Sequence, residues 1–257
     1  MYLIKVNSKL LILLNNSRIG VFLYLYQNDD RLRIFQTLSL CQIHQKSLIC
    51  NQKSEILMNF LAHIYLSGEN DLMKIGNFMA DGIHGKNFDA FPIEIQKGII
   101  LHREIDTFTD AHPVFRQSTK RLHANYHHYS GIIVDIFYDH FLAKNWGNYS
   151  DEKLEDYTER FYQSLRDNYD LLNEKTQKMV PYLIAQNWLL SYQTIDGIEI
   201  ILQKMDNRMK RNSHNSNMQL AVAELRTYYS EFENEFTTFF EEIKTHSEQK
   251  IETDLSP

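Results

Sequence analysis

A histidine and two aspartates recur at one-turn spacing in the stretch KGIILHREIDTFTDAH. If this stretch is helical, His102, Asp106 and Asp110 fall at i, i+4 and i+8 on one face, beside a stripe of apolar residues. Side chains one turn apart on a helix are neighbours, so His102 and Asp106 are spaced to bind one cation. The alternative is an exposed helix with paired charges, since Arg103 and Glu104 belong to such a face.

A second pair of carboxylates lies in SGIIVDIFYDHFLAKN, which is apolar almost all the way round and therefore predicts a buried helix. Asp135 and Asp139 are one turn apart there, and His140 follows directly. A buried carboxylate costs several kcal/mol unless it is paired or bound to a metal, and two of them repel each other. One cation bound by both carboxylates would most simply remove this repulsion. The alternative is an aspartate that caps a neighbouring helix or pairs with an arginine such as Arg103.

Two further candidates come from short motifs nearer the N-terminus. His63 lies in NFLAHIYLS, where a lone histidine between apolar neighbours is more often a core residue than a ligand. Asp81 lies in GNFMADGIHG just before Gly82, which favours the end of a helix. A carboxylate at a helix C-terminus is electrostatically unfavourable, so a cation near Asp81 would resolve the mismatch.

Together these candidates form a set of oxygen and imidazole donors without thiolates, which suits Mn²⁺, Mg²⁺ or Fe²⁺ better than structural Zn²⁺. The sequence contains no HExxH, phosphate-binding P-loop, GxSxG or dinucleotide-binding motif. The residues therefore predict metal-assisted hydrolysis, most naturally of a phosphate ester, with Arg103 stabilising the developing charge. The full set is His63, Asp81, His102, Asp106, Asp110, Asp135, Asp139 and His140.

The composition narrows the class of protein. The chain has 257 residues, 43% hydrophobic and 23% charged, with only nine glycines and four prolines, which favours a helical core. A net charge of −6 argues against a general nucleic-acid binder. Two cysteines, Cys41 and Cys50, give no disulfide framework. We expect a cytoplasmic protein without membrane association, because the apolar runs are short and no signal-peptide cleavage site follows the first of them.

The helical elements that must position these residues begin at Met58. We expect an all-α fold, a single helical domain over residues 58–245, followed by a charged tail over 246–257 that frays. Residues 1–57 show no persistent periodicity. They are either an over-extended gene start or an N-terminal extension that folds as a helix or hairpin. The expected helices cover about 58–66, 71–81, 97–112, 130–145, 151–172, 176–192 (bent or begun again at Pro181), 197–211 and 218–245. A further helix after His112-Pro113 carries Arg116, Lys120 and Arg121.

The motifs MNFLAHIYLS, GNFMADGIHG, GIILHREIDTFTDAH and VDIFYDHFLAKNW, in this order and spacing, resemble the acyl carrier protein phosphodiesterase family. The resemblance starts at Met58 and weakens after Trp146. It implies hydrolysis of the phosphodiester that joins 4'-phosphopantetheine to a serine of holo-acyl carrier protein. It also implies Mn²⁺ as the metal and an all-helical fold distantly related to HD-type phosphohydrolases.

The resemblance further implies roles for individual residues. His102, Asp106 and Asp139 are the strongest ligand candidates, followed by Asp81, His63 and His140. Arg103 would contact the phosphoryl group, and Asp110 or Asp135 would orient the attacking water or the ligands. The Asp139–His140 order is the reverse of the adjacent His-Asp pair of HD enzymes, so that relationship does not assign ligands one by one.

The implied partner is an acidic carrier protein, which requires local basic patches on an acidic enzyme. Two clusters could form such carrier-binding patches: Arg116, Lys120 and Arg121, and Lys204, Arg208, Lys210 and Arg211. Either could instead be an ordinary solvated face. Two other functions stay open at this point. One is a metal phosphohydrolase that acts on a nucleotide or another small phosphodiester, and the other is a non-catalytic helical module that binds an acidic carrier.

Overall fold

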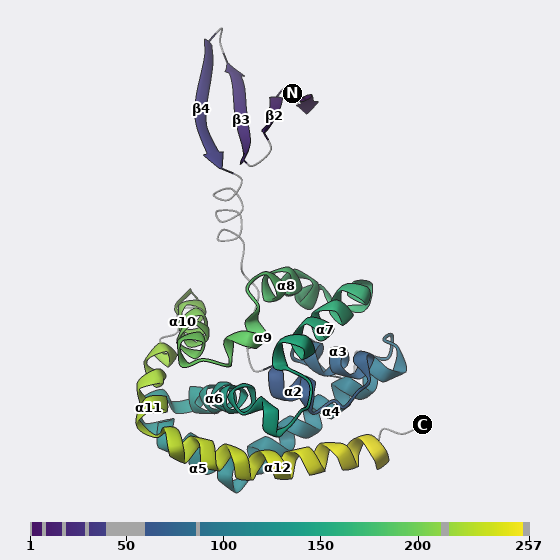
Figure 1. Ribbon diagram of the computed structural model, residues 1–257, viewed down its shortest axis with the longest axis vertical. Coiled ribbons are helices and arrows are strands. Elements are labelled where there is room, and N and C mark those ends of the chain that lie inside the picture. Colours follow the sequence, from purple (N-terminus) through teal and green to yellow (C-terminus); the bar gives the residue numbers. More distant parts are fainter. Residues whose placement is uncertain are drawn as a thin grey trace. The chain divides into compact units, whose positions relative to one another are not determined.

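The chain divides into two units, Met1–Ser54 and Glu55–Pro257, in a computed structural model (Figure 1). The structure describes residues 60–85, 88–211 and 216–253 of the second unit. Of the first unit it describes the backbone of four strands: β1 (Tyr2–Val6), β2 (Lys9–Asn16), β3 (Ile19–Asn28) and β4 (Arg31–Ser39). The expected start at Met58 lies outside the described residues.

The four strands pair in chain order, and each pair is antiparallel. Leu13 of β2, for example, lies opposite Phe22 of β3. The register between β3 and β4 shifts between Phe22 and Tyr24. Of the two conformations expected for an N-terminal extension, the described strands correspond to hairpins.

The second unit is all-α over its described residues, which confirms the expected fold class. Its α-helices are α2 (Leu61–Tyr65), α3 (Asp71–Met79), α4 (Ile93–Ala111), α5 (Pro113–Tyr126), α6 (Ser130–Lys144), α7 (Leu154–Asp167), α8 (Glu174–Ala185), α9 (Trp188–Ser191), α10 (Ile195–Arg211), α11 (Val222–Thr227) and α12 (Tyr229–Thr253). Short 3₁₀ turns join several of them: η1 (Ala80–Gly82), η2 (His127–Tyr129), η3 (Trp146–Asn148), η4 (Tyr169–Leu171) and η5 (Met218–Ala221). No helix in the described part of the chain combines the length and apolar character that crossing a membrane requires.

The C-terminal boundary corrects one expectation. Residues 246–253 of the predicted tail are helical, because α12 continues to Thr253. This last part of α12 has packing partners: Ser247 is buried, Ile251 packs against the core, and the His246 ring stacks on Phe108 with centroids 4.6 Å apart. A helix end with such contacts does not fray.

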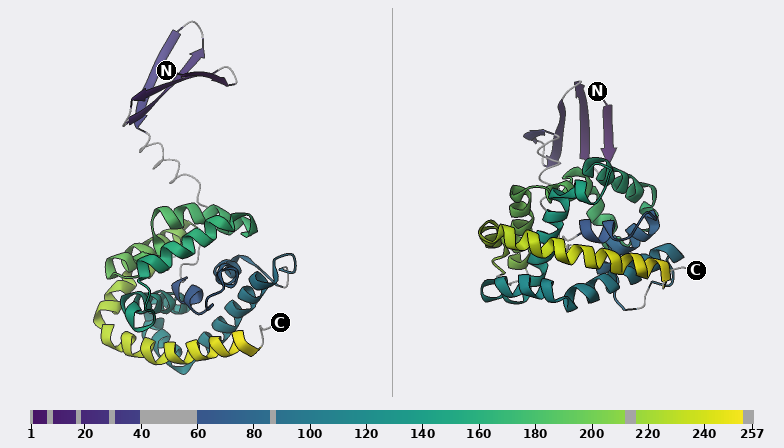
Figure 2. Two further views of the ribbon diagram at one scale, coloured as in Figure 1. Left: turned by 45° about the vertical axis from the view of Figure 1, so that its right-hand side comes forward. Right: turned by 60° about the horizontal axis from the view of Figure 1, so that its bottom comes forward.

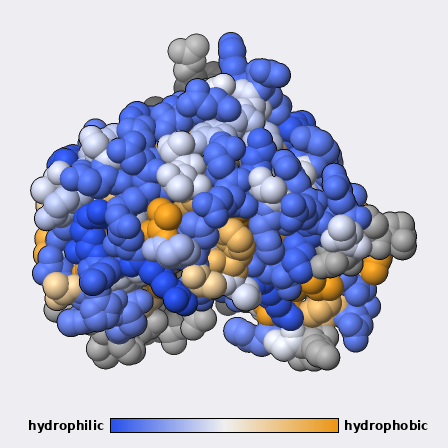
Figure 3. All heavy atoms as spheres, turned by 90° about the horizontal axis from the view of Figure 1, so that it is seen from below, coloured by the Kyte–Doolittle hydropathy of each residue, from blue (hydrophilic) through white to orange (hydrophobic). Residues whose placement is uncertain are grey.

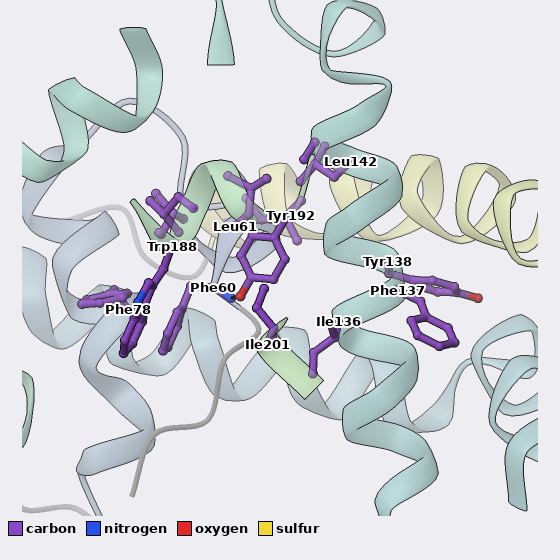
Figure 4. Close-up of a cluster of buried hydrophobic side chains, with 14 of the residues drawn as sticks. Phe60, Leu61, Phe78, Ile136, Phe137, Tyr138, Leu142, Trp188, Tyr192 and Ile201 are labelled. Carbon is purple, nitrogen blue, oxygen red and sulfur yellow. Dashed lines mark hydrogen bonds between the residues drawn. The ribbon is translucent and has the colours of Figure 1, made fainter. Parts of the chain in front are cut away.

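A second difference concerns the stretch expected as one helix over 176–192. The helix α8 passes through Pro181 and ends at Ala185, and α9 begins after Asn187, which adopts a left-handed conformation. The break places Tyr192 in the core, where its exposed fraction is 1%. Figure 4 shows the Tyr192 ring between Leu61 and Ile201, with its hydroxyl oxygen directed toward Phe60. The backbone N–H of Phe60 donates to that hydroxyl over 3.4 Å.

The helix α6 is buried on nearly every side, as its apolar sequence predicts. Around it, α12 passes along one side of the unit, and Figures 1 and 2 show α3 and α4 side by side. The outer surface seen in Figure 3 is largely hydrophilic, with apolar residues in separate small patches.

The helices α3 and α4 approach each other backbone to backbone. A Cβ atom added to Gly76 of α3 would lie 2.2 Å from the carbonyl oxygen of Ile95, and one added to Gly98 of α4 would lie 2.2 Å from that of Met73. Both distances are far inside van der Waals contact, so only glycine is compatible with this crossing. The crossing sets the distance between side chains of α3 and α4 that follow the two glycines.

We expect Gly98→Ala to lower the free energy of unfolding by about 1–3 kcal/mol, because the added methyl group must separate two packed helices. The control is Gly131→Ala in α6, where an added Cβ meets nothing within 4 Å. The control should be neutral or slightly stabilising, by up to about 1 kcal/mol, because alanine is the better helix former. Urea denaturation of both variants measures the difference. Equal stability of the two variants would contradict the close crossing.

Candidate metal centre

Two histidines and an aspartate from α2 and α4 converge at one point. His63 Nε2 lies 3.4 Å from Asp106 Oδ1, and His102 Nε2 lies 3.2 Å from Asp106 Oδ2. The two imidazole rings stack with centroids 4.3 Å apart. One donor atom from each of these three residues lies within 4.8 Å of the others, a spacing that one metal ion can bridge. Asp81, in the turn η1 that follows α3, joins the group with its Oδ1 3.4 Å from His102 Nε2.

The buried side chain of Asn77 in α3 orients both imidazoles. Its Nδ2 donates to the carbonyl oxygen of His63 and to the hydroxyl of Ser67, each over 2.9 Å. These bonds determine which end of the amide faces the rings. The Oδ1 atom therefore accepts from Nδ1–H of His63 over 2.9 Å and from Nδ1–H of His102 over 3.0 Å. Both Nε2 atoms consequently face the carboxylates.

The two histidines differ in charge because their surroundings differ. Burial, reinforced by the nearby charge of His102, lowers the pKa of His63 to about 4. Burial also opposes charge on His102, but the carboxylates of Asp106 and Asp81 outweigh it and raise the pKa of His102 to about 9. Without another cation, the carboxylates therefore keep a proton on His102, and a metal ion must displace that proton.

The arrangement around His63 fits a bound cation. Neutral His63 donates through Nδ1, so its Nε2 carries a lone pair, and that lone pair faces the Asp106 carboxylate at 3.4 Å. Two hydrogen-bond acceptors directed at each other repel. A divalent cation between them turns this repulsion into attraction, and imidazole nitrogen with carboxylate oxygen is a donor set that Mn²⁺ and Fe²⁺ accept. Asp106 is half exposed, so an ion reaches the site from solvent.

The carboxylates of this site stay ionised in spite of their surroundings. Burial alone would raise the pKa of Asp81 and of Asp106. The hydrogen bond from His102 and the positive charge of that ring outweigh burial, so the pKa of each carboxyl group is lowered. Both side chains are thus available as anionic ligands.

The structure gives Asp139 and His140 other partners. Asp139 accepts from the backbone N–H groups of Leu61 and Ala62 over 3.1 and 2.8 Å, so it caps the first turn of α2. His140 is engaged through both ring nitrogens, by the carbonyl oxygen of Tyr192 at 2.7 Å and the hydroxyl of Tyr229 at 2.8 Å. These contacts correspond to the helix-capping alternative for Asp139. They also leave His140 no free ring nitrogen, whereas metal binding by Asp139 stays a prediction.

Asp135 lies next to the site without a hydrogen-bond partner in the described structure. It lines a small cavity of about 30 Å³ together with His63, Thr109 and Tyr138. Burial, followed by the negative charges of Asp106 and Asp139, raises the pKa of Asp135 well above its usual range. The side chain of Asp110, by contrast, is exposed, and its backbone carbonyl accepts from Arg116 Nε over 2.8 Å.

Arg103 lies at the rim, one residue after His102. Its Nη2 donates to the carbonyl oxygens of Gly85 at 2.6 Å and Ile83 at 3.3 Å, and its guanidinium lies 5.1 Å from the centroid of the Phe88 ring. Arg103 thus holds the segment that follows Asp81. Among the described residues, its Nε and Nη1 have no hydrogen-bond partner.

Several residues expected to bind the carrier have intramolecular partners instead. Arg121 forms a two-bond ion pair with the buried Glu235, with both N···O distances at 2.7 Å. Lys210 pairs with the buried Asp206 at 2.9 Å, and Lys204 donates to Gln186 at 2.7 Å. These three cations stabilise the fold locally, which weakens the case for them as carrier contacts.

The other members of the two patches differ in exposure. Arg116, Lys120 and Arg211 are exposed, whereas Arg208 is half-buried. Carrier binding by these four residues stays a prediction.

The sequence reasoning missed Asn77. The signal was available, since Asn77 is a polar residue in the otherwise apolar run IGNFMA, and it precedes Asp81 by one helical turn. Nothing local indicates that its amide reaches two histidines, because these lie on α2 and α4.

The fold and the site together define an all-helical protein with a candidate His/His/Asp metal centre. A model of the family described as acyl carrier protein phosphodiesterase matches residues 58–243. The chain belongs to this family of hydrolases that act on a phosphodiester bond.

Proteins named acyl carrier protein phosphodiesterase from three bacteria show the extent of the likeness. The Yersinia pestis protein is 29% identical over 194 residues, which cover 75% of this chain and 99% of the relative. The Photorhabdus laumondii protein is 30% identical over 75% of this chain and 96% of its own length. The Klebsiella pneumoniae protein is 31% identical over 75% and 99%. No solved structure shows a significant match.

We expect Asn77→Leu to weaken Mn²⁺ binding by about 10- to 100-fold, because it removes the acceptor that orients both imidazoles. Asn77→Asp keeps an acceptor at that position and should bind Mn²⁺ more tightly than the leucine variant. Isothermal titration calorimetry measures both affinities. The control is Asn145→Ala, since Asn145 donates to Glu233 away from the site. Wild-type affinity in Asn77→Leu would show that Asn77 does not orient the ligands.

A second prediction concerns the Arg121–Glu235 pair. Burial opposes charge on Glu235, but hydrogen bonds from Arg121 and Ser118 outweigh it and lower the pKa of Glu235 below its usual 4.5. A lowered folded-state pKa contributes stability above pH 4.5, and this stability is lost as the pH falls through the folded-state value. We expect Glu235→Gln to be less stable than wild type by about 3 kcal/mol at pH 7. The difference should shrink below pH 4.5, as measured by urea denaturation. A difference independent of pH would contradict the role of the charge.

Proposed function

We propose that this protein is a metal-dependent phosphodiesterase that removes 4'-phosphopantetheine from the serine of holo-acyl carrier protein. Membership of the family and the names of its relatives support the substrate and the bond. The observation that carries the metal dependence is the orientation of His63 and His102. Asn77 binds both Nδ1–H groups, and both Nε2 atoms converge on Asp106.

The proposed ligands are His63 Nε2, His102 Nε2 and the Asp106 carboxylate, with Asp81 beside them. Nitrogen and oxygen donors without sulfur favour Mn²⁺. A bound divalent cation supplies Lewis acidity toward the phosphoryl oxygens. An HD-like ancestry and a cytoplasmic location stay predictions of the sequence.

The residues of the chain account for the remaining steps. Water adds to phosphorus, the P–O bond to serine breaks, and the serine oxygen takes up a proton, which gives apo-carrier and 4'-phosphopantetheine. Asp135 is better placed than Asp110 to handle that proton. It lines a cavity with His63, and its raised pKa keeps a proton available at higher pH than an exposed carboxyl group would. Arg103 at the rim orients the diester with the N–H groups that the Gly85 segment does not use.

We expect intact-protein mass spectrometry to show loss of the phosphopantetheine mass from holo-acyl carrier protein when enzyme and Mn²⁺ are present, and no loss with a chelator. Asp106→Asn should abolish the reaction, because it replaces a carboxylate ligand with a neutral amide. Asp135→Asn should keep the metal dependence and slow the reaction by about 100-fold or more, a typical effect of losing acid–base catalysis.

The matched control is Glu104→Gln, two residues before Asp106 on α4. Glu104 faces Lys250 at 3.2 Å and does not contact the metal centre, so its variant should react like wild type. Full activity in the presence of chelator would overturn the metal dependence. Inactivity of the wild type under both conditions would overturn the proposed substrate.

A further inference from the structure

Acidic side chains surround the position that the anionic substrate must reach. Asp81 and Asp106 lie together at the centre, and Asp135 lines the cavity beside them with His63. A phosphodiester on an acidic carrier is also an anion. If the proposed function holds, a positive side chain at the mouth of the site must offset this repulsion. Arg103 is partly used by the carbonyl oxygens of Ile83 and Gly85.

A second positively charged side chain, that of Lys175, lies in the first turn of α8. Asn173 caps this helix by accepting from the N–H of Thr176, and its Nδ2 donates to the carbonyl oxygen of Met79 over 3.2 Å. The same side chain therefore ties the N-terminus of α8 to the end of α3, two residues before Asp81. Lys175 follows the cap by two residues, so this tie carries it toward the metal centre.

The position of Lys175 is set by Gly82. Its Cδ lies 3.3 Å from the point that a Cβ on Gly82 would occupy, so the lysine stem passes directly over the residue after Asp81. The positive charge of Lys175 is close enough to contribute to the lowered pKa of Asp81. Among the described residues, its ammonium has neither a hydrogen-bond nor an ion-pair partner.

The next lysine along α8 provides a contrast. Lys178 is exposed and pairs with Glu174, with 2.5 Å between its Nζ and the carboxylate oxygen. Its charge is therefore neutralised within the helix. Lys175, one turn earlier, has a charge available for a molecule that enters the site.

We propose that Lys175 binds an anionic oxygen of the substrate at the mouth of the metal centre, either on the diester phosphate or on an acidic side chain of the carrier. It is then a substrate-binding residue of the same site that the proposed function describes. Arg103 and Lys175, from α4 and α8, both flank the segment that carries Asp81 and Gly82.

The test compares Lys175→Gln with the matched control Lys178→Gln. Loss of one charge-assisted hydrogen bond should raise KM for holo-acyl carrier protein about tenfold, with kcat within about twofold of wild type. Lys175→Arg should recover most of this loss, and Lys178→Gln should match wild type. A parallel assay with bis(4-nitrophenyl) phosphate distinguishes the two anions. A raised KM for this small diester assigns the phosphate, whereas an effect confined to the carrier assigns its carboxylates.

Two results would overturn the role of Lys175. One is a KM of Lys175→Gln equal to that of Lys178→Gln while the wild type is active. The other is an altered Mn²⁺ affinity by calorimetry with an unchanged KM, which would mean that Lys175 acts only through Asp81. A wild type that leaves holo-carrier intact overturns the proposed function itself, and this outcome is recognised before any variant is compared.

Discussion

The site depends on the backbone contact between α3 and α4. Gly76 and Gly98 lack the Cβ atoms that would hold the two helices apart. Because the helices are this close, the Asn77 amide of α3 reaches the His102 ring of α4 within hydrogen-bond distance. A shift of one ångström at the crossing would break that bond and release the imidazole. Two residues without side chains therefore govern the geometry of residues that do chemistry.

The Asn77 amide also reduces the electrostatic conflict of the site. Two imidazoles stacked 4.3 Å apart beside carboxylates could adopt several tautomers and protonation states. The bonds from Asn77 to Ser67 and to the His63 backbone leave only its oxygen for the rings. Both rings must then donate through Nδ1 and present Nε2 to the carboxylates. The proton on His102 and a divalent cation compete for the same carboxylates, so metal binding should release a proton.

The main contribution of the buried helix α6 to the metal centre is to hold the helix that carries His63. Asp139 accepts hydrogen bonds from the N–H groups at the N-terminus of α2. This helix is only five residues long and carries His63. Burial raises the pKa of Asp139 to about 7, although the N–H groups of Ala62 and Leu61 act in the opposite direction. A helix this short has little stability of its own. Its capping by Asp139 and its contact with Tyr192 keep His63 in place.

The sequence by itself determined the helical class, the pairing of His102 with Asp106 and the family. These follow from properties local to one segment: the 3.6-residue period, an apolar helix surface and the order of short motifs. The sequence did not predict the helical end of α12, because contacts with Phe108 and Glu104 of α4 stabilise it.

Only the tertiary structure decided which polar residues meet. Asp139 and Asp106 both looked like ligands from their own helices, yet one caps α2 and the other faces two imidazoles. Arg121 looked like a free surface cation until α12 placed Glu235 against it. The role of a polar side chain depends on the residue that it contacts. Here those residues lie on helices that are distant in the sequence. Periodicity assigns a residue to a face of its helix, and packing alone determines what that face meets.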